Sequence, residues 1–248
     1  MTTSSLSPPP LEVLQCSAGY GRREIFSDLS LVLQPGEIFG LIGLNGVGKT
    51  TLIKSLLDLG PLRSGLIRIF GRDHRQAASR QHLAYLPDRF QPASSLRGDE
   101  FLALARAHFR LPPDAARNQA CCLALGLDPA VLPQPIRTYS KGMGQKLALA
   151  ATFVTGRPLV ILDEPMSGLD PLARVQLKRQ LLASRAEGHT VFFSSHILAD
   201  IEEICDRVGV FHGGQMRFIG APGELLRSTG AASLEAAFLQ AIGEEVAA

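Results

Sequence analysis

The sequence has few of the features that mark secreted or membrane-spanning chains. It contains only four cysteines in 248 residues and no C-x-x-C spacing, so neither a disulfide framework nor a zinc site is indicated. No apolar run approaches the roughly 20 residues that a helix needs to cross a bilayer. Residues 1–10 are rich in Ser, Thr and Pro and lack the pattern of a secretory signal, which predicts a short flexible tail. The reducing cytosol is the simplest compartment, and any membrane role would require a partner.

The sequence also lacks an excess of charge of either sign. Its 25 Lys and Arg residues against 23 Asp and Glu give a formal net charge of +2. Nucleic-acid binding would show as a basic excess or a clustered basic face, so this balance gives no case for it. Hydrophobic residues make up 46% and charged residues 19%, which is typical of a folded chain with one large domain or two closely joined ones.

The N-terminal part shows short β-like runs, and the middle changes to helical spacing. Apolar runs at 11–14, 29–33 and 37–42 are separated by turn residues, and another strand is expected at 66–70. The run at 37–42 is nearly all apolar, as expected for a strand buried on both faces. From about residue 90 to 155 apolar residues recur at helical spacing between prolines. We therefore expect a helical subdomain inserted into an α/β core, with Cys121 and Cys122 as ordinary helix residues.

The core pattern resumes after this insertion. A buried strand is expected at 159–162, a helix at 171–187 and another strand at 190–193. Val208–Phe211 and Gln215–Ile219 flank two glycines, which predicts a hairpin. Two helical pieces follow, so we expect a tail at 1–10, a main domain at 11–220 and a C-terminal helical tail at 221–248.

A complete phosphate-binding motif follows the apolar run at 37–42. The pattern G-x-x-x-x-G-K-[ST] is matched in full, with a buried strand before it and a helical pattern after it. Glycines let successive backbone N–H groups point at phosphate oxygens, and the following helix presents its positive end to the same anion. Lys49 can reach the β- and γ-phosphates, and the Thr50 hydroxyl can ligate Mg²⁺. The residues predicted to bind the nucleotide are Gly43, Leu44, Asn45, Gly46, Val47, Gly48, Lys49, Thr50 and Thr51.

Two carboxylates follow the strand at 159–162. Open α/β sheets bind ligands at the carboxyl ends of their strands, so Asp163 and Glu164 are placed where a ligand would lie. Asp163 is suited to hold Mg²⁺, directly or through water, and Glu164 to orient or deprotonate an attacking water. Two acids after a strand can also simply begin a surface turn. Their presence beside a phosphate loop favours the functional interpretation.

Together these residues resemble the ATP-binding subunit of an ATP-binding-cassette (ABC) transporter, over about residues 11–220. Tyr20 lies where the family stacks an aromatic ring on adenine. Tyr139–Met143, read Tyr-Ser-Lys-Gly-Met, is similar to the family signature, and Ser167–Asp170 is similar to the loop after the acidic strand. His196 matches the family's switch histidine. The resemblance implies the P-loop NTPase (RecA-like) α/β fold with an antiparallel β subdomain and an inserted α-helical subdomain.

The resemblance also implies a site shared between two copies. Ser140 and Gly142 open a helix, where a hydroxyl, N–H groups and the helix dipole can meet a γ-phosphate. In the family that phosphate belongs to the opposite subunit, so ATP is sandwiched between two subunits that are identical or different. Asp170 is implied to contact the partner subunit. His196 would bridge the γ-phosphate and Glu164.

Two departures from the family pattern affect these expectations. The signature carries Lys141 and Met143 where many members have Gly and Gln. This form resembles a branch whose permeases are of the ABC-2 type, mostly exporters. In addition, Pro87-Asp88 stands where the family has a glutamine that ligates Mg²⁺ and touches the permease. Asp88 is a further candidate ligand of Mg²⁺, since a carboxylate can take that role.

The sequence therefore predicts an ATPase that uses ATP and Mg²⁺ to power an integral membrane permease, at the inner face of the cell membrane. Glu164 and His196 are the expected catalytic residues. One alternative is a soluble ABC-type ATPase acting on ribosomes or DNA, but such proteins usually carry two cassettes or a long coiled coil. A regulatory cassette that does not hydrolyse ATP is another, against which the intact Glu164 and His196 argue.

Overall fold

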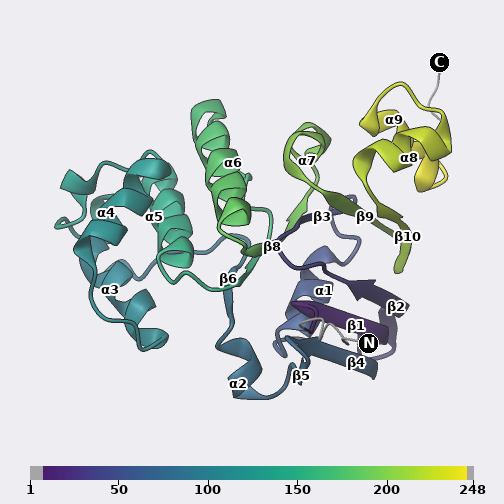
Figure 1. Ribbon diagram of the computed structural model, residues 1–248, viewed down its shortest axis with the longest axis horizontal. Coiled ribbons are helices and arrows are strands. Elements are labelled where there is room, and N and C mark those ends of the chain that lie inside the picture. The colour runs from purple at the N-terminus through teal and green to yellow at the C-terminus, as the bar shows by residue number, and fades with distance from the viewer. Residues whose placement is uncertain (1–7, 245–248) are drawn as a thin grey trace, which may run out of the picture.

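The computed structural model describes residues 8–244 (Figure 1). Residues 1–7 of the predicted tail and the last four residues of the predicted C-terminal tail lie outside this range. Pro10 is already buried, and its carbonyl accepts a hydrogen bond of 3.2 Å from the Phe70 amide. No helix between residues 8 and 244 combines the length and apolar character that crossing a membrane requires.

A six-stranded sheet in the order β10-β9-β3-β8-β7-β6 forms the centre of the molecule. All neighbouring pairs are parallel except β9 and β10, which form the predicted hairpin. The carboxyl ends of the parallel strands therefore meet at one edge. The strands are β3 Ile38–Ile42, β6 Leu83–Leu86, β7 Leu159–Leu162, β8 Thr190–Ser195, β9 Arg207–His212 and β10 Gln215–Gly220.

Side chains on the central strands alternate between two hydrophobic cores. In β3, Ile38 and Ile42 belong to one core, whereas Phe39 and Leu41 belong to the other. Phe39 stacks on Phe192 of β8 with ring centroids 5.7 Å apart. A strand buried on both faces needs apolar residues at every position, which explains the continuous apolar runs in the sequence.

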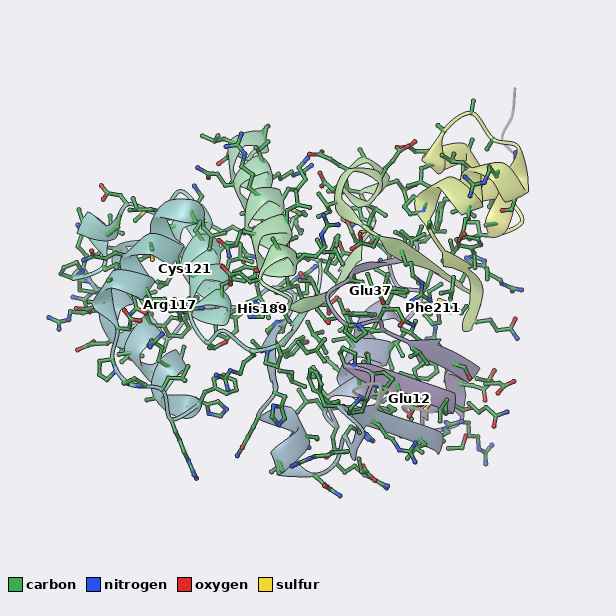
Figure 2. All side chains as sticks on the ribbon, viewed as in Figure 1. Glu12, Glu37, Arg117, Cys121, His189 and Phe211 are labelled. Carbon is green, nitrogen blue, oxygen red and sulfur yellow. The ribbon has the colours of Figure 1, made fainter. Side chains whose placement is uncertain are left out.

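An antiparallel sheet in the order β2-β1-β4-β5 packs on the side of the central sheet that helix α1 covers. Phe211 of β9 lies at the junction of the two sheets (Figure 2), and its ring meets Phe26 of β2 edge to face at 6.5 Å. This sheet is the predicted antiparallel β subdomain. Its elements and helix are β1 Leu11–Tyr20, β2 Arg23–Val32, β4 Ser64–Ile69, β5 Arg72–Asp73 and α1 Lys49–Leu56.

The opposite face of the central sheet is covered by helices that share one core with it. Helices α3, α4 and α5 gather at one end of the molecule, within the predicted insertion at 90–155, and α8 and α9 lie at the other end (Figure 1). Cys121 and Cys122 both lie in α4 as free thiols, and Cys122 is buried, as expected for ordinary helix residues. The helices are α2 Ala77–Arg80, α3 Gly98–His108, α4 Ala115–Ala124, α5 Lys141–Phe153, α6 Pro171–Ala186, α7 Leu198–Ile204, α8 Pro222–Thr229 and α9 Leu234–Ala241, with 3₁₀ turns at Pro129–Val131 and Ile136–Thr138.

Strand β3 and helix α7 pack closely because Gly40 has no side chain. A Cβ atom at Gly40 would lie 2.6 Å from Cδ1 of Ile201 and 2.8 Å from Sγ of Cys205, both at the α7 side of the strand. Helix α7 begins two residues after His196. Gly40 therefore affects how the segment that carries His196 is seated on the sheet.

We expect Gly40→Ala to lower the free energy of unfolding by about 1–3 kcal/mol, since overpacking must displace α7. Thermal unfolding followed by circular dichroism measures the change. Gly223→Ala, in helix α8, is the matched control. It should be neutral or slightly stabilising because alanine favours helix interiors. An unchanged melting temperature for Gly40→Ala would show that the contact is not tight.

Candidate functional site

The predicted phosphate loop connects β3 to α1 at the edge where the parallel strands end. Gly46 and Gly48 have φ values of 79° and 112°, in the region that favours glycine, and a backbone of this kind can turn successive N–H groups toward a bound anion. Gly48 is the N-cap residue of α1; it supplies no side-chain cap, and the first turn of the helix contains no acidic residue. The uncapped N-terminus of α1, with its positive end, is therefore suited to an anion.

Lys49 is buried at the start of α1 and lies among oxygen atoms. Its Nζ atom donates to the Gly43 carbonyl at 2.6 Å and lies 3.0 Å from Oε1 of Glu164. Only 6% of the side chain is exposed. The lysine is thus held at the mouth of the phosphate loop, next to the carboxylate that the sequence marks as catalytic.

Glu164 connects this lysine to His196. Its Oε2 atom lies 2.8 Å from Nδ1 of His196, and its Oε1 atom faces Lys49. The Glu164 backbone has φ of 50°, in the left-handed region, which costs a non-glycine residue roughly 1–3 kcal/mol. Such strain is common at functional sites, where the surrounding structure holds the residue in place.

Asp163 lies directly before Glu164 and is almost fully buried, with 1% exposed. Its Oδ1 atom accepts a hydrogen bond of 2.6 Å from the Ser194 hydroxyl, whereas Oδ2 has no hydrogen-bond partner among the residues described. Burial raises the pKa of this carboxyl, although the Ser194 hydrogen bond and the nearby Thr50 hydroxyl partly oppose the shift. A buried, unpaired carboxylate oxygen beside a threonine hydroxyl suits a hard cation such as Mg²⁺.

These carboxylates do not form a metal site by themselves. Within residues 8–244 no cluster of three or more His, Cys, Asp or Glu side chains can hold a metal ion. Mg²⁺ is commonly held by one or two carboxylates together with phosphate oxygens and water. The residues present therefore fit a cation that binds together with a nucleotide.

A cavity of about 1070 Å³ opens over this edge of the sheet. Its wall includes the phosphate loop, Asp88, Glu164 and His196, together with Ser140 from the signature segment. Of the predicted site residues, Tyr20, Gly43, Val47, Gly142 and Asp163 do not line it; Asp163 is buried beneath the wall, and Tyr20 stands at the end of β1 with 51% of the residue exposed. The structure thus brings most of the predicted site residues together, and it leaves Tyr20 apart from the cavity.

Two predicted contact residues also cap helices of their own chain. The Ser140 hydroxyl accepts a hydrogen bond from the Met143 amide at the start of α5, and Asp170 accepts one from Ala173 at the start of α6. Both residues therefore have a role in the fold of their own chain, apart from any contact with a partner. A capping hydroxyl keeps its proton and a second lone pair for another partner.

The site contains two polar residues that the sequence did not single out. Ser194, on β8, bonds to both the Asp163 side chain and the Glu164 backbone. Tyr85, on β6, has a buried hydroxyl without a partner in the described part of the chain, and burial together with the charges of Asp163 and Asp88 raises its pKa. In the sequence, Tyr85 lies within an apolar strand and Ser194 directly follows one, and both strands end at the site. This position was the only signal that could have identified them.

The fold and the site together define a nucleotide-binding protein of the P-loop class. The family model for ABC transporters matches residues 26–167, and the chain belongs to this family. One relative is an uncharacterized ABC transporter ATP-binding protein of Synechocystis sp., 37% identical over 206 residues that cover 82% of this chain. The chain spans only 58% of that protein's length, and 60% of a similarly described protein of Nostoc sp..

Other relatives match over a larger share of their own length. The ABC-type transporter ATP-binding protein EcsA of Bacillus subtilis is 31% identical, with 95% of this chain and 97% of that protein covered. The bacitracin transport ATP-binding protein BcrA of Enterococcus faecalis is 32% identical, with 83% and 67% covered. A solved ATP-binding subunit of an ABC transporter superposes with a TM-score of 0.84 at 33% identity, covering 93% of this chain and 98% of that one. These names do not favour a ribosome- or DNA-directed ATPase.

The raised pKa of Asp163 has a consequence for stability. A carboxyl group whose pKa is raised in the folded state contributes stability that is fully present below its unfolded pKa and is lost as the pH rises through the folded pKa. We expect Asp163→Asn to unfold at a higher temperature than the wild type at pH 7 without nucleotide. The melting temperature should rise by about 2–4 °C for each kcal/mol recovered.

The difference between Asp163→Asn and the wild type should shrink as the pH falls toward 4, because the folded carboxyl, whose pKa is raised, becomes protonated before the carboxyl in the unfolded chain. Calorimetric melting of both proteins between pH 4 and 8 measures it. Asp128→Asn, on the exposed turn before the first 3₁₀ segment, is a control for loss of a carboxylate. A less stable Asp163→Asn at pH 7 would show that the charged form of Asp163 is favoured in the fold.

Proposed function

We propose that this chain binds ATP with Mg²⁺ and hydrolyses it as one of two cassettes that drive a membrane permease. The observation that carries the proposal is the alignment of Lys49, Glu164 and His196 at the mouth of the phosphate loop. A plain nucleotide-binding loop needs the lysine alone. A carboxylate held between that lysine and a histidine is suited to act on a water molecule.

In this proposal the phosphate loop binds the anion. The N–H groups of residues 43–51, the α1 N-terminus and the Lys49 ammonium supply positive potential for the phosphates. Asp163 and Thr50 would hold Mg²⁺, and Asp88 on the cavity wall is a further ligand candidate. When bound, Mg²⁺ neutralises charge that develops on the phosphates.

Glu164 would act as the residue that orients or deprotonates the attacking water. Its two oxygens already contact Lys49 and His196, so the side chain is held by two donors from different elements. A phosphate bound at Lys49 would compete for the lysine and free one carboxylate oxygen for water. His196, which is partly exposed on the cavity wall, would then fix the other oxygen.

The second half of the site is proposed to come from another ATP-binding subunit, identical or different. Ser140 and Gly142 at the start of α5 would contact the γ-phosphate bound to the opposite subunit, and Asp170 would contact that subunit. Tyr20 is exposed at a strand end, where it is free to stack on adenine. This arrangement would leave each chain with an incomplete site until two chains close on ATP.

An integral membrane permease is proposed as the partner that uses this closure. The Tyr-Ser-Lys-Gly-Met form of the signature supports an ABC-2 type permease, and the relative named for bacitracin transport supports a transport role. The ATPase would then lie on the cytoplasmic face of the membrane through its permease. The permease would choose the cargo.

Replacing Glu164 by glutamine tests the catalytic role. The amide keeps the shape of the side chain but cannot accept a proton, so we expect kcat to fall by about 10²–10⁴-fold. ATP affinity should stay near the wild-type value. Phosphate release and equilibrium binding of a fluorescent ATP analogue measure the two effects. Glu202→Gln, on the exposed face of α7, should hydrolyse ATP normally, and unchanged hydrolysis by Glu164→Gln would remove Glu164 from the mechanism.

The shared site is tested by dimerisation of the Glu164→Gln protein on MgATP. We expect the mass measured by light scattering to double when MgATP is added to the Glu164→Gln protein. The double variant Glu164→Gln, Ser140→Arg should keep the mass of a monomer, because the bulky arginine would collide with the nucleotide of the opposite subunit. Ser228→Arg, on an exposed position of α8, should leave the dimer intact. A dimer of the Ser140→Arg protein would contradict the proposed role of the signature.

A further inference from the structure

Ser194 is a buried serine at the carboxyl end of strand β8. In the order β3-β8-β7, this strand lies directly between the strand that leads to the phosphate loop and the strand that leads to Asp163. Leu162 of β7 is paired with Phe193 of β8. The next residue on each strand is therefore brought side by side, and this places Asp163 next to Ser194.

The Ser194 hydroxyl makes two hydrogen bonds whose directions are fixed by chemistry. The Glu164 amide donates to Oγ at 2.9 Å, since a backbone N–H can only donate. The hydroxyl proton then goes to Oδ1 of Asp163 at 2.6 Å, which a carboxylate can accept. A single side chain thus connects the backbone of Glu164 to the side chain of Asp163. No exposed part of Ser194 remains, with 0% of the residue accessible.

The bond to Asp163 determines which oxygen is free. Because Oδ1 is occupied by the Ser194 proton, Oδ2 is left as the unpaired oxygen at the position where a cation would bind. Groups that hydrogen-bond to a metal-binding carboxylate orient it and commonly affect metal affinity. Without the hydroxyl, the carboxylate can rotate about its last bond and lose this orientation.

The bond to Glu164 supports an unfavourable backbone conformation. The Glu164 amide is turned away from β6, whose Leu86 carbonyl instead accepts the preceding amide, that of Asp163, at 2.9 Å. With φ of 50°, the chain reverses at Glu164 and its side chain is directed to Lys49 and His196. Removal of the Ser194 oxygen would leave a part-buried amide without its acceptor, at the residue that is already strained.

We propose that Ser194 is a positioning residue that sets the orientation of Asp163 and Glu164 with one hydroxyl group. The inference rests on the proposed function, in which Asp163 holds the cation and Glu164 acts on water. Ser194 itself is fully buried and would touch neither nucleotide nor the attacking water. Its hydroxyl fixes the metal-binding carboxylate of Asp163 relative to the backbone of Glu164, so that both residues are in position when MgATP binds.

The test compares Ser194→Ala with Ser194→Thr, which keeps the hydroxyl, and with Ser194→Cys, which keeps the volume and only a weak donor. Ser184→Ala, a buried serine of α6 remote from the cavity, is the matched control. Steady-state hydrolysis gives kcat and the Mg²⁺ concentration for half-maximal rate. Calorimetric titration with ATP, with and without Mg²⁺, gives binding in the Glu164→Gln background, where turnover does not interfere.

We expect Ser194→Ala to lower kcat by about 10–100-fold and to raise the half-saturating Mg²⁺ concentration by about tenfold. Affinity for ATP without Mg²⁺ should not change, because the phosphate loop is untouched. Ser194→Thr should recover most of the activity, and Ser194→Cys should fall between them. General damage to the fold would reduce the active fraction but would not shift the Mg²⁺ dependence, and Ser184→Ala should show neither effect.

Several results would overturn the inference. One is a Ser194→Ala protein with an unchanged Mg²⁺ dependence and a rate near the wild type. Another is a folded Ser194→Thr protein as impaired as Ser194→Ala; if neither folds, Ser194→Cys decides by the same Mg²⁺ shift. A wild-type chain that binds MgATP but does not hydrolyse it would contradict the proposed function, while the calorimetric Mg²⁺ effect would still decide the role of Ser194. A chain that binds no MgATP would overturn both.

Discussion

Parallel pairing of β3, β8 and β7 is the constraint on which the rest of the site depends. Because these strands run in the same direction and in register, their ends deliver the phosphate loop, the segment before His196 and the two acidic residues to one edge. The contacts of Glu164 with Lys49 and His196 follow from this arrangement. Backbone pairing thus brings residues more than a hundred positions apart to the same edge, where their side chains reach hydrogen-bonding distance.

The fold was most predictable where burial left a simple pattern. Strands β3 and β7 are buried on both faces, and their nearly continuous apolar runs predicted them correctly. Strand β1 extends to Tyr20, whereas the prediction ended at residue 14. The prediction stopped early because the register of β1 with β2 shifts at several points, which makes the apolar pattern irregular. Helix α7 was not predicted, since seven residues are too few to show a clear period.

The site was predictable where its chemistry is local in sequence. The phosphate loop and the acidic pair are contiguous motifs, and the structure places them together. Their roles, like those of Tyr20 and Asp88, stay predictions. Ser194 could not be found from the sequence, because its importance comes from the pairing of β7 with β8 and not from any neighbouring residue. Ser140 and Asp170 each cap a helix of their own chain, so the geometry explains their presence at helix starts whether or not they also contact a partner.

The bare start of helix α1 has a consequence for the folding of the chain. Helices α4, α5, α6 and α9 each begin at a residue whose side chain accepts a hydrogen bond from the first turn, but α1 begins at Gly48, which has no side chain to do so. A bound phosphate would accept hydrogen bonds from the first amides of α1, so the nucleotide would act as the N-cap of the helix as well as the ligand of the site. The amides of the first turn of α1 should then exchange with solvent slowly only when the nucleotide is bound, which couples local order at this helix to the supply of ATP.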